Sequence, residues 1–120
     1  MDVKAFYEQI GGNYSDAVAT MMTDAFIERM LQKFLANNAF SALREHYAAK
    51  DFRGVFEASH SLKGVCGNLA LTPLYLLASE ICEMTRSLPE GQTVEIGEPM
   101  KKITEEYEKI ASLLTAAFPA

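Results

Sequence analysis

The spacing of apolar residues is the feature that most restricts the fold of this chain. Apolar residues recur at intervals of three and four, which is the period of an α-helix, and β-branched residues nowhere alternate over a useful run. The periodic segments are separated by residues that end or start helices, among them Gly11-Gly12, Thr72-Pro73 and the loop at 89–92. The sequence therefore predicts an all-α protein.

Short helices are predicted in front of four longer helical segments. The short helices fall within residues 3–22, and Ser15 is the expected N-cap of the second. The longer segments are predicted at about 23–50, 51–71, 73–88 and 97–118, with N-caps at Thr23, Asp51 and Thr72 and a restart near Asn37 or Asn38. Short connections between the longer helices favour an up-down four-helix bundle. We expect one domain over residues 1–120, because a chain of this length has room for one core.

Composition excludes several classes of protein. The net charge of −5 argues against nucleic acid or an anionic membrane surface as the main partner. No apolar run reaches the roughly 18 residues of a membrane helix, and the first residues lack the pattern of a secretory signal. Cys66 and Cys82 have no metal-binding or redox spacing, so we expect reduced, half-buried thiols. A cytoplasmic monomer is the expectation.

The segment 60–69 contains the candidate functional residues. On a helical wheel of 100° per residue, one continuous face is apolar and must point into the core; its members are Val55, Ala58, Leu62, Val65, Cys66 and Leu69. His60 lies on the opposite face and is therefore predicted to be exposed. Its neighbours on that outward stripe are Phe56, Lys63, Gly64 and Gly67. Phe26 and Met84, on other helices, are predicted to point into the core, and His46 is predicted to be solvated.

These residue types together suit phosphoryl transfer. Each glycine inside a helix costs roughly 1 kcal/mol relative to alanine, yet Gly64 and Gly67 stand beside the histidine. The missing side chains would let another protein approach the imidazole, and Lys63 would place a cation near a phosphoryl group on that ring. A nucleophilic nitrogen, a clearing and a counter-charge are what such a reaction requires.

The same residues also allow other interpretations. A lone histidine on a protein surface usually has no special function. Glycines inside helices more often allow close packing of helices, but packing would place them on the buried face. A helical interaction or dimerisation module that keeps the fold without phosphotransfer is the alternative function. A metal or haem site built from His46 and His60 is disfavoured, because the two lie on different predicted helices without other ligands nearby.

The sequence resembles the histidine phosphotransfer (HPt) domain family. The resemblance rests on His60-Ser61-Leu62-Lys63-Gly64, then Asn68-Leu69 and the helix start at Thr72-Pro73-Leu74, and it covers most of residues 10–90. It implies that His60 Nε2 accepts a phosphoryl group from the phospho-aspartate of a receiver domain and passes it to another receiver. Lys63 would stabilise the phosphorylated state, and Gly64 would permit access.

The resemblance also implies the partners. Response-regulator receiver domains or a hybrid sensor histidine kinase would be the binding partners, and the receiver would supply Mg²⁺. The chain itself would hold no cofactor. It would also be a carrier without an ATP site, and not an enzyme.

Two positions depart from the family's pattern. Leu69-Ala70 stands where Leu-Gly is usual, and Cys82 stands where several members have a glutamine that bonds the imidazole. Cys82 and Arg86 are expected on one stripe off the core side of their helix, so Arg86 is a candidate for contact with the phosphoryl group. Gly67 and Phe56 are candidates for the docking surface, and packing of Phe56 against the short N-terminal helices is the alternative.

Overall fold

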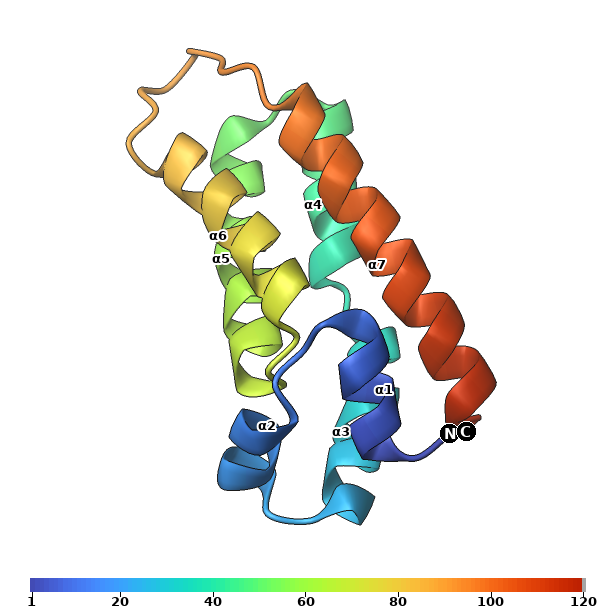
Figure 1. The fold of residues 1–120 in the computed structure, drawn as a ribbon. Helices are drawn as coiled ribbons and strands as arrows, with labels where there is room; N and C mark the ends of the chain where they lie inside the picture. The colour runs from blue at the N-terminus through green and yellow to red at the C-terminus, as the bar shows by residue number, and fades with distance from the viewer. Residues whose placement is uncertain (120) are drawn as a thin grey trace.

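Seven helices make up the computed structural model, which describes residues 1–119 and shows no strand among them (Figure 1). They are α1 (Val3–Ile10), α2 (Tyr14–Met21), α3 (Asp24–Ala36), α4 (Ala39–Ala48), α5 (Phe52–Asn68), α6 (Thr72–Arg86) and α7 (Gly97–Ala117). The prediction of an all-α protein with short N-terminal helices is confirmed. None of the helices in this described part is both long and apolar enough to span a membrane.

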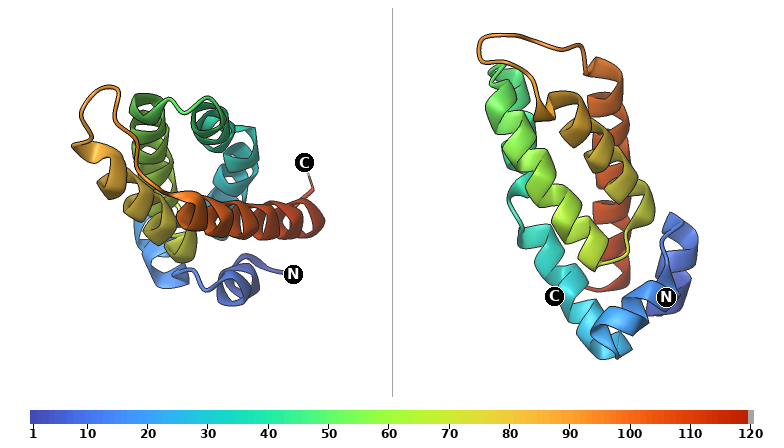
Figure 2. Two further views of the ribbon diagram at one scale, coloured as in Figure 1. Left: turned by 90° about the horizontal axis from the view of Figure 1, so that it is seen from above. Right: turned by 90° about the vertical axis from the view of Figure 1, so that its left-hand side faces the viewer.

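The bundle is built from α5, α6, α7 and the pair α3–α4. α3 and α4 follow one another along one side of the molecule (Figure 2), so the predicted segment at 23–50 is two helices. The break lies at Asn37, whose backbone is extended and whose side chain accepts a hydrogen bond from the Ala39 amide at 2.8 Å. An asparagine side chain competes with helical hydrogen bonds in this way, which explains the restart. The most extensive packing joins α5 to α6 and α4 to α5.

The short N-terminal helices cover the end of the bundle far from the 87–96 loop (Figure 1). The ring of Tyr7 is fully buried, and its hydroxyl donates a 2.7 Å hydrogen bond to the carbonyl of Leu69. The amide of Asn13 donates to the carbonyl of Ala70 at 3.1 Å. Residues before α3 therefore fasten the turn that follows α5.

Several helix ends differ from the predicted ones. α5 ends at Asn68 and not near residue 71, because Ala70 takes a left-handed backbone conformation with φ of 54°. Thr72 is the first residue of α6 and not its N-cap. Asn13, not Ser15, caps α2. The caps Thr23 and Asp51 are confirmed, because their side chains accept hydrogen bonds from the amides of Phe26 and Gly54.

Some core assignments were wrong. Phe26 is 39% exposed, because the buried stripe of α3 runs through Ile27, Leu31 and Phe34. Met84 is 37% exposed, because α6 turns Ile81, Cys82 and Thr85 inward instead. Cys66 and Cys82 are fully buried and not half-buried. Burial raises the pKa of the Cys66 thiol to about 12.

His46 is held at the corner between α4 and α5. Its Nδ1 lies 2.9 Å from Oδ2 of Asp51, the residue that caps α5, and the imidazole, which was predicted to be solvated, is 41% exposed. The same ring lies against Gly54, where a Cβ atom would collide with it. Gly54 therefore serves packing at this corner.

Candidate functional site

His60 projects from the middle of α5 away from the core. α5 buries Val55, Ala58, Ser59, Leu62 and Cys66, and the predicted apolar face is confirmed except that Val65 is only half-buried. His60 is exposed on the other side. Because α4 and α6 hold the helix along its length, the imidazole is presented to solvent from a fixed backbone.

The two glycines near His60 have different surroundings. A Cβ atom added at Gly64 would meet nothing within 4 Å, so the surface beside it is open. A Cβ atom at Gly67 would lie 3.3 Å and 3.4 Å from two ring carbons of Tyr75 on α6. The expected clearing is therefore made by Gly64 alone, and Gly67 makes room for a neighbouring aromatic ring.

Phe56 lies one helical turn before His60 and stacks on its ring. The two ring centroids are 5.9 Å apart and the planes differ by 6°, which is an offset parallel arrangement. The guanidinium carbons of Arg86 and Arg53 lie 5.3 Å and 5.9 Å from the centre of the Phe56 ring. The half-buried Phe56 thus contacts cations and the candidate acceptor ring, and no such contact joins it to the N-terminal helices.

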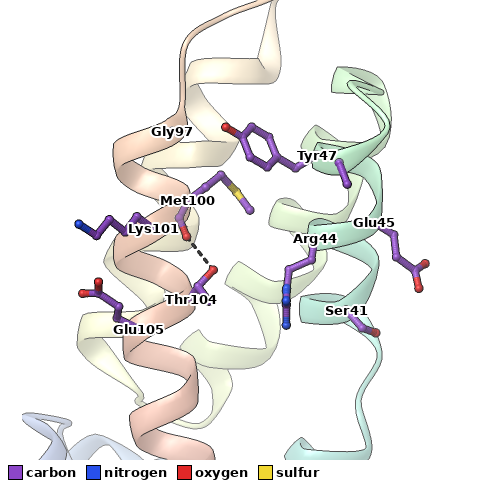
Figure 3. A pocket seen from close by; sticks show the side chains of 10 residues that line it. Ser41, Arg44, Glu45, Tyr47, Gly97, Met100, Lys101, Thr104 and Glu105 are labelled. Atoms are coloured by element: carbon purple, nitrogen blue, oxygen red, sulfur yellow. Dashed lines mark hydrogen bonds between the residues drawn. The ribbon is translucent and has the colours of Figure 1, made fainter.

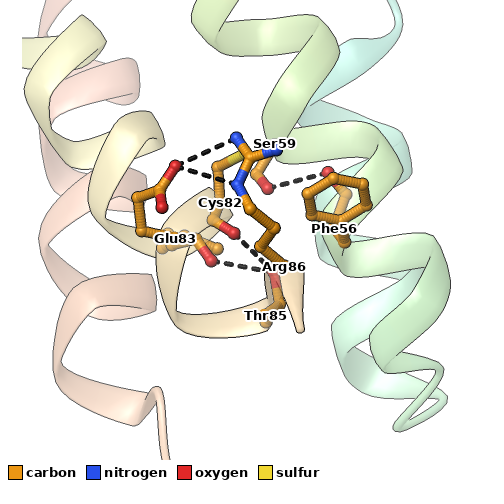
Figure 4. A network of polar contacts seen from close by, with 7 residues as sticks. Phe56, Ser59, Cys82, Glu83, Thr85 and Arg86 are labelled. Atoms are coloured by element: carbon orange, nitrogen blue, oxygen red, sulfur yellow. Dashed lines mark hydrogen bonds and ion pairs between the residues drawn. The ribbon is translucent and has the colours of Figure 1, made fainter. Parts of the chain in front are cut away.

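Arg86 is fixed by an ion pair on its own helix (Figure 4). Its Nε and Nη2 donate to Oε1 of Glu83 at 3.1 Å and 2.9 Å, and Nη2 lies 3.7 Å from the sulfur of Cys82. The hydrogen bonds from Arg86 hold the pKa of the Glu83 carboxyl below its ordinary value, and the charge of Lys63 acts in the same direction. Lys63 on α5 therefore faces α6, half-buried.

The register of α5 against α6 places Cys82 of α6 beside α5. The helices run antiparallel, with Tyr75 over Gly67 at one end and Arg86 over Phe56 at the other. Counting residues along both helices from either contact places Cys82 level with His60. Cys82 is fully buried, so its expected place off the core side was wrong.

No hydrogen bond holds the His60 ring among the described residues. Over residues 1–119, the one hydrogen bond to a histidine ring is that of His46 with Asp51. The same register places Ser79 level with Lys63. The buried hydroxyl of Ser79 has no hydrogen-bond partner within residues 1–119. The imidazole nitrogens are therefore open to a partner.

A groove of considerable volume lies elsewhere, between α4 and α7 (Figure 3). It has a volume of about 820 Å³, and Arg44, Tyr47, Met100 and Thr104 are among the residues that line it. None of its lining residues belongs to α5. Within residues 1–119, no three histidine, cysteine or acidic side chains lie together as metal ligands would. The surface around His60, by contrast, combines an exposed imidazole with the nearby cations Lys63 and Arg86.

Comparison with known proteins identifies a family for this chain. The family model described as Hpt domain matches residues 24–113, three quarters of the 120-residue chain. The match begins at α3 and reaches into α7, whereas the resemblance in the sequence suggested residues 10–90; α1 and α2 lie outside it. Neither the curated proteins nor the solved structures contain a match. The chain belongs to the Hpt domain family.

Proposed function

We propose that this protein is a phosphocarrier on which His60 accepts a phosphoryl group from a receiver-domain phospho-aspartate and passes it to another receiver. Domains of this family act in phosphorelays with receiver domains and kinases, as carriers and not as enzymes. The observation that supports His60 is its exposure on α5 beside the open surface at Gly64.

The proposed reaction needs little from this chain beyond position. An unprotonated imidazole nitrogen attacks phosphorus, a P–N bond forms, and the bond between phosphorus and the aspartyl oxygen breaks. The carboxylate leaves with the electron pair and remains on the receiver. Transfer to a second receiver reverses these steps. The receiver supplies Mg²⁺ in this proposal, and this chain supplies the nucleophile.

Lys63 and Gly64 are proposed to assist His60. Lys63 follows His60 by one helical turn, which suits an ammonium group that balances phosphoryl charge. Gly64 leaves space for the receiver surface to approach, since nothing lies within 4 Å of the position its Cβ would take. Arg86 is a further candidate for contact with the phosphoryl group, because it reaches over the Phe56 ring on which His60 stacks.

Transfer of label from phosphorylated receivers tests the proposal. The purified protein is incubated with each of a panel of receiver domains carrying labelled phospho-aspartate, and we expect acid-labile, alkali-stable label on this chain. His60→Gln should abolish the label. The chain has two histidines, so His46→Gln is the matched control and should keep it. Label that persists in His60→Gln but disappears in His46→Gln would refute the assignment of His60.

The alternative of an interaction module without phosphotransfer predicts a different outcome. Such a protein would bind a receiver or a kinase and take no label from any of them. Incubation with ATP alone should leave the chain unlabelled in either case, because we propose that it has no ATP site. The cytoplasmic location stays a prediction.

A further inference from the structure

Phe56 and His60 form one unit on the surface of α5. Their rings lie parallel, with 5.9 Å between centroids and 6° between planes, and both stand on the outward side of the helix one turn apart. Such an offset arrangement places the phenyl ring against one side of the imidazole. We infer that Phe56 is a positioning residue that holds the His60 ring in the orientation for phosphoryl transfer. This inference rests on the proposed function.

A stacked contact suits an imidazole that must act as a nucleophile. The lone pair that attacks phosphorus lies in the plane of the ring and points outward from its edge. A stacked neighbour contacts the ring from its face and takes neither nitrogen as a hydrogen-bond partner. Phe56 therefore restricts rotation of the imidazole without occupying either nitrogen.

Phe56 is itself fixed from the neighbouring helix. The guanidinium of Arg86 on α6 lies 5.3 Å from its ring centre, and Arg86 is held by Glu83 through hydrogen bonds of 2.9 Å and 3.1 Å. A cation over an aromatic ring is attracted by its negative face. The ion pair, the aromatic ring and the imidazole thus form a chain of contacts that runs from α6 to the candidate acceptor, and Figure 4 shows the part from Glu83 to Phe56.

Among the described residues, the Phe56 ring is the group that can set the orientation of the His60 imidazole. No hydrogen bond reaches the His60 ring from residues 1–119, and Cys82, which lies level with it on α6, is fully buried. A hydrogen-bond acceptor would fix both the ring plane and the nitrogen that carries the proton. Stacking fixes the plane alone, so both neutral tautomers of His60 should be populated in the wild type.

Substitution of Phe56 separates positioning from folding. Phe56→Leu keeps an apolar side chain but removes the ring current, whereas Phe56→Tyr keeps the aromatic face. By NMR, the His60 ring protons should lose their ring-current shift in Phe56→Leu and keep it in Phe56→Tyr. Phe52→Leu, the same change one turn earlier on α5, is the matched control and should leave those resonances in place. The spectra also show whether each variant is folded.

The kinetic test measures the rate of phosphoryl transfer at saturating and at limiting concentrations of a phosphorylated receiver. We expect the maximal transfer rate of Phe56→Leu to fall by roughly tenfold or more with little change in KM, because a misplaced nucleophile slows the chemical step and not the docking. Phe56→Tyr should restore most of the rate. A loss confined to KM, or a Tyr variant as slow as the Leu variant, would overturn the positioning role.

The NMR measurement keeps this inference distinct from the proposed function. A wild-type protein that takes no phosphoryl group from any receiver would overturn both, and that result is seen without any Phe56 variant. Normal transfer by the wild type together with equally fast transfer by Phe56→Leu would overturn the positioning role alone. Unchanged His60 ring shifts in Phe56→Leu would overturn the stacking itself.

Discussion

Gly64→Ala should make this protein more stable and a slower phosphoryl acceptor. The added methyl group would contact nothing within 4 Å, so no strain offsets the gain in helix propensity. Gly64 stands inside a helix of 17 residues and is exposed, and alanine is favoured over glycine there by about 1 kcal/mol. For a domain of this size that corresponds to a rise in Tm of roughly 3–6 °C.

Thermal and urea unfolding measure the stability, and transfer from a phosphorylated receiver measures the function. We expect the transfer rate to fall modestly in Gly64→Ala and much further in Gly64→Leu, because the longer side chain fills the space that a receiver would enter. Both variants should bury no more surface on folding and should unfold with the wild-type denaturant slope.

Gly67→Ala provides the contrast on the same helix. Its Cβ atom would lie 3.3 Å from the ring of Tyr75, so the ring must move and the propensity gain should be partly or wholly cancelled. A Gly67→Ala variant that is more stable than the wild type, beside a Gly64→Ala variant that is not, would refute the surroundings assigned to the two glycines. A Gly64→Leu variant that accepts a phosphoryl group as quickly as the wild type would show that access is not the reason for the glycine.

Three further outcomes follow from other contacts. Arg86→Ala should shorten the lifetime of phosphorylated His60 and slow transfer, and an unchanged lifetime and rate would show that the guanidinium does not reach the phosphoryl group. Tyr7→Phe should lower the free energy of unfolding by about 1–3 kcal/mol in urea titrations, because the buried hydroxyl donates at 2.7 Å to a carbonyl that would lose its partner. The hydrogen bond from the Gly54 amide holds the pKa of the Asp51 carboxyl below its ordinary value of 3.8. The stability that this cap contributes is therefore present above pH 3.8 and is lost as the pH falls through the lowered pKa of Asp51. Asp51→Asn, which can still cap the helix, should flatten that part of the pH–stability curve.

Local features of the fold were predictable from the sequence. Thr23 and Asp51 cap helices through hydrogen bonds that reach only three residues along the chain, so composition near each helix start is enough to identify them. The direction of His60 follows from helical periodicity alone, because the apolar face of α5 has to be buried. The family match confirms the fold that this pattern indicated.

Features that depend on a neighbouring helix were not predictable in the same way. A helical wheel gives the direction of Gly67 but not the ring of Tyr75 that lies above it. The same limit applies to α6, which packs against both α5 and α7 and therefore buries a wider arc than one apolar stripe. Cys82 falls inside that arc and Met84 outside it, which reverses the prediction for both.

The end of α5 shows how tertiary contacts decide a helix boundary and, with it, the rigidity of the candidate site. The apolar pattern continues to Leu71, yet the helix stops at Asn68, where Tyr7 and the amide of Asn13 bind the carbonyls that follow. These two partners come from residues outside the family match, so the N-terminal helices are an addition that secures one end of α5. Asp51 caps the other end. A helix fixed at both ends and along one face suits the proposed role of His60, because a rigid backbone leaves only the two torsions of that side chain to set the attacking geometry.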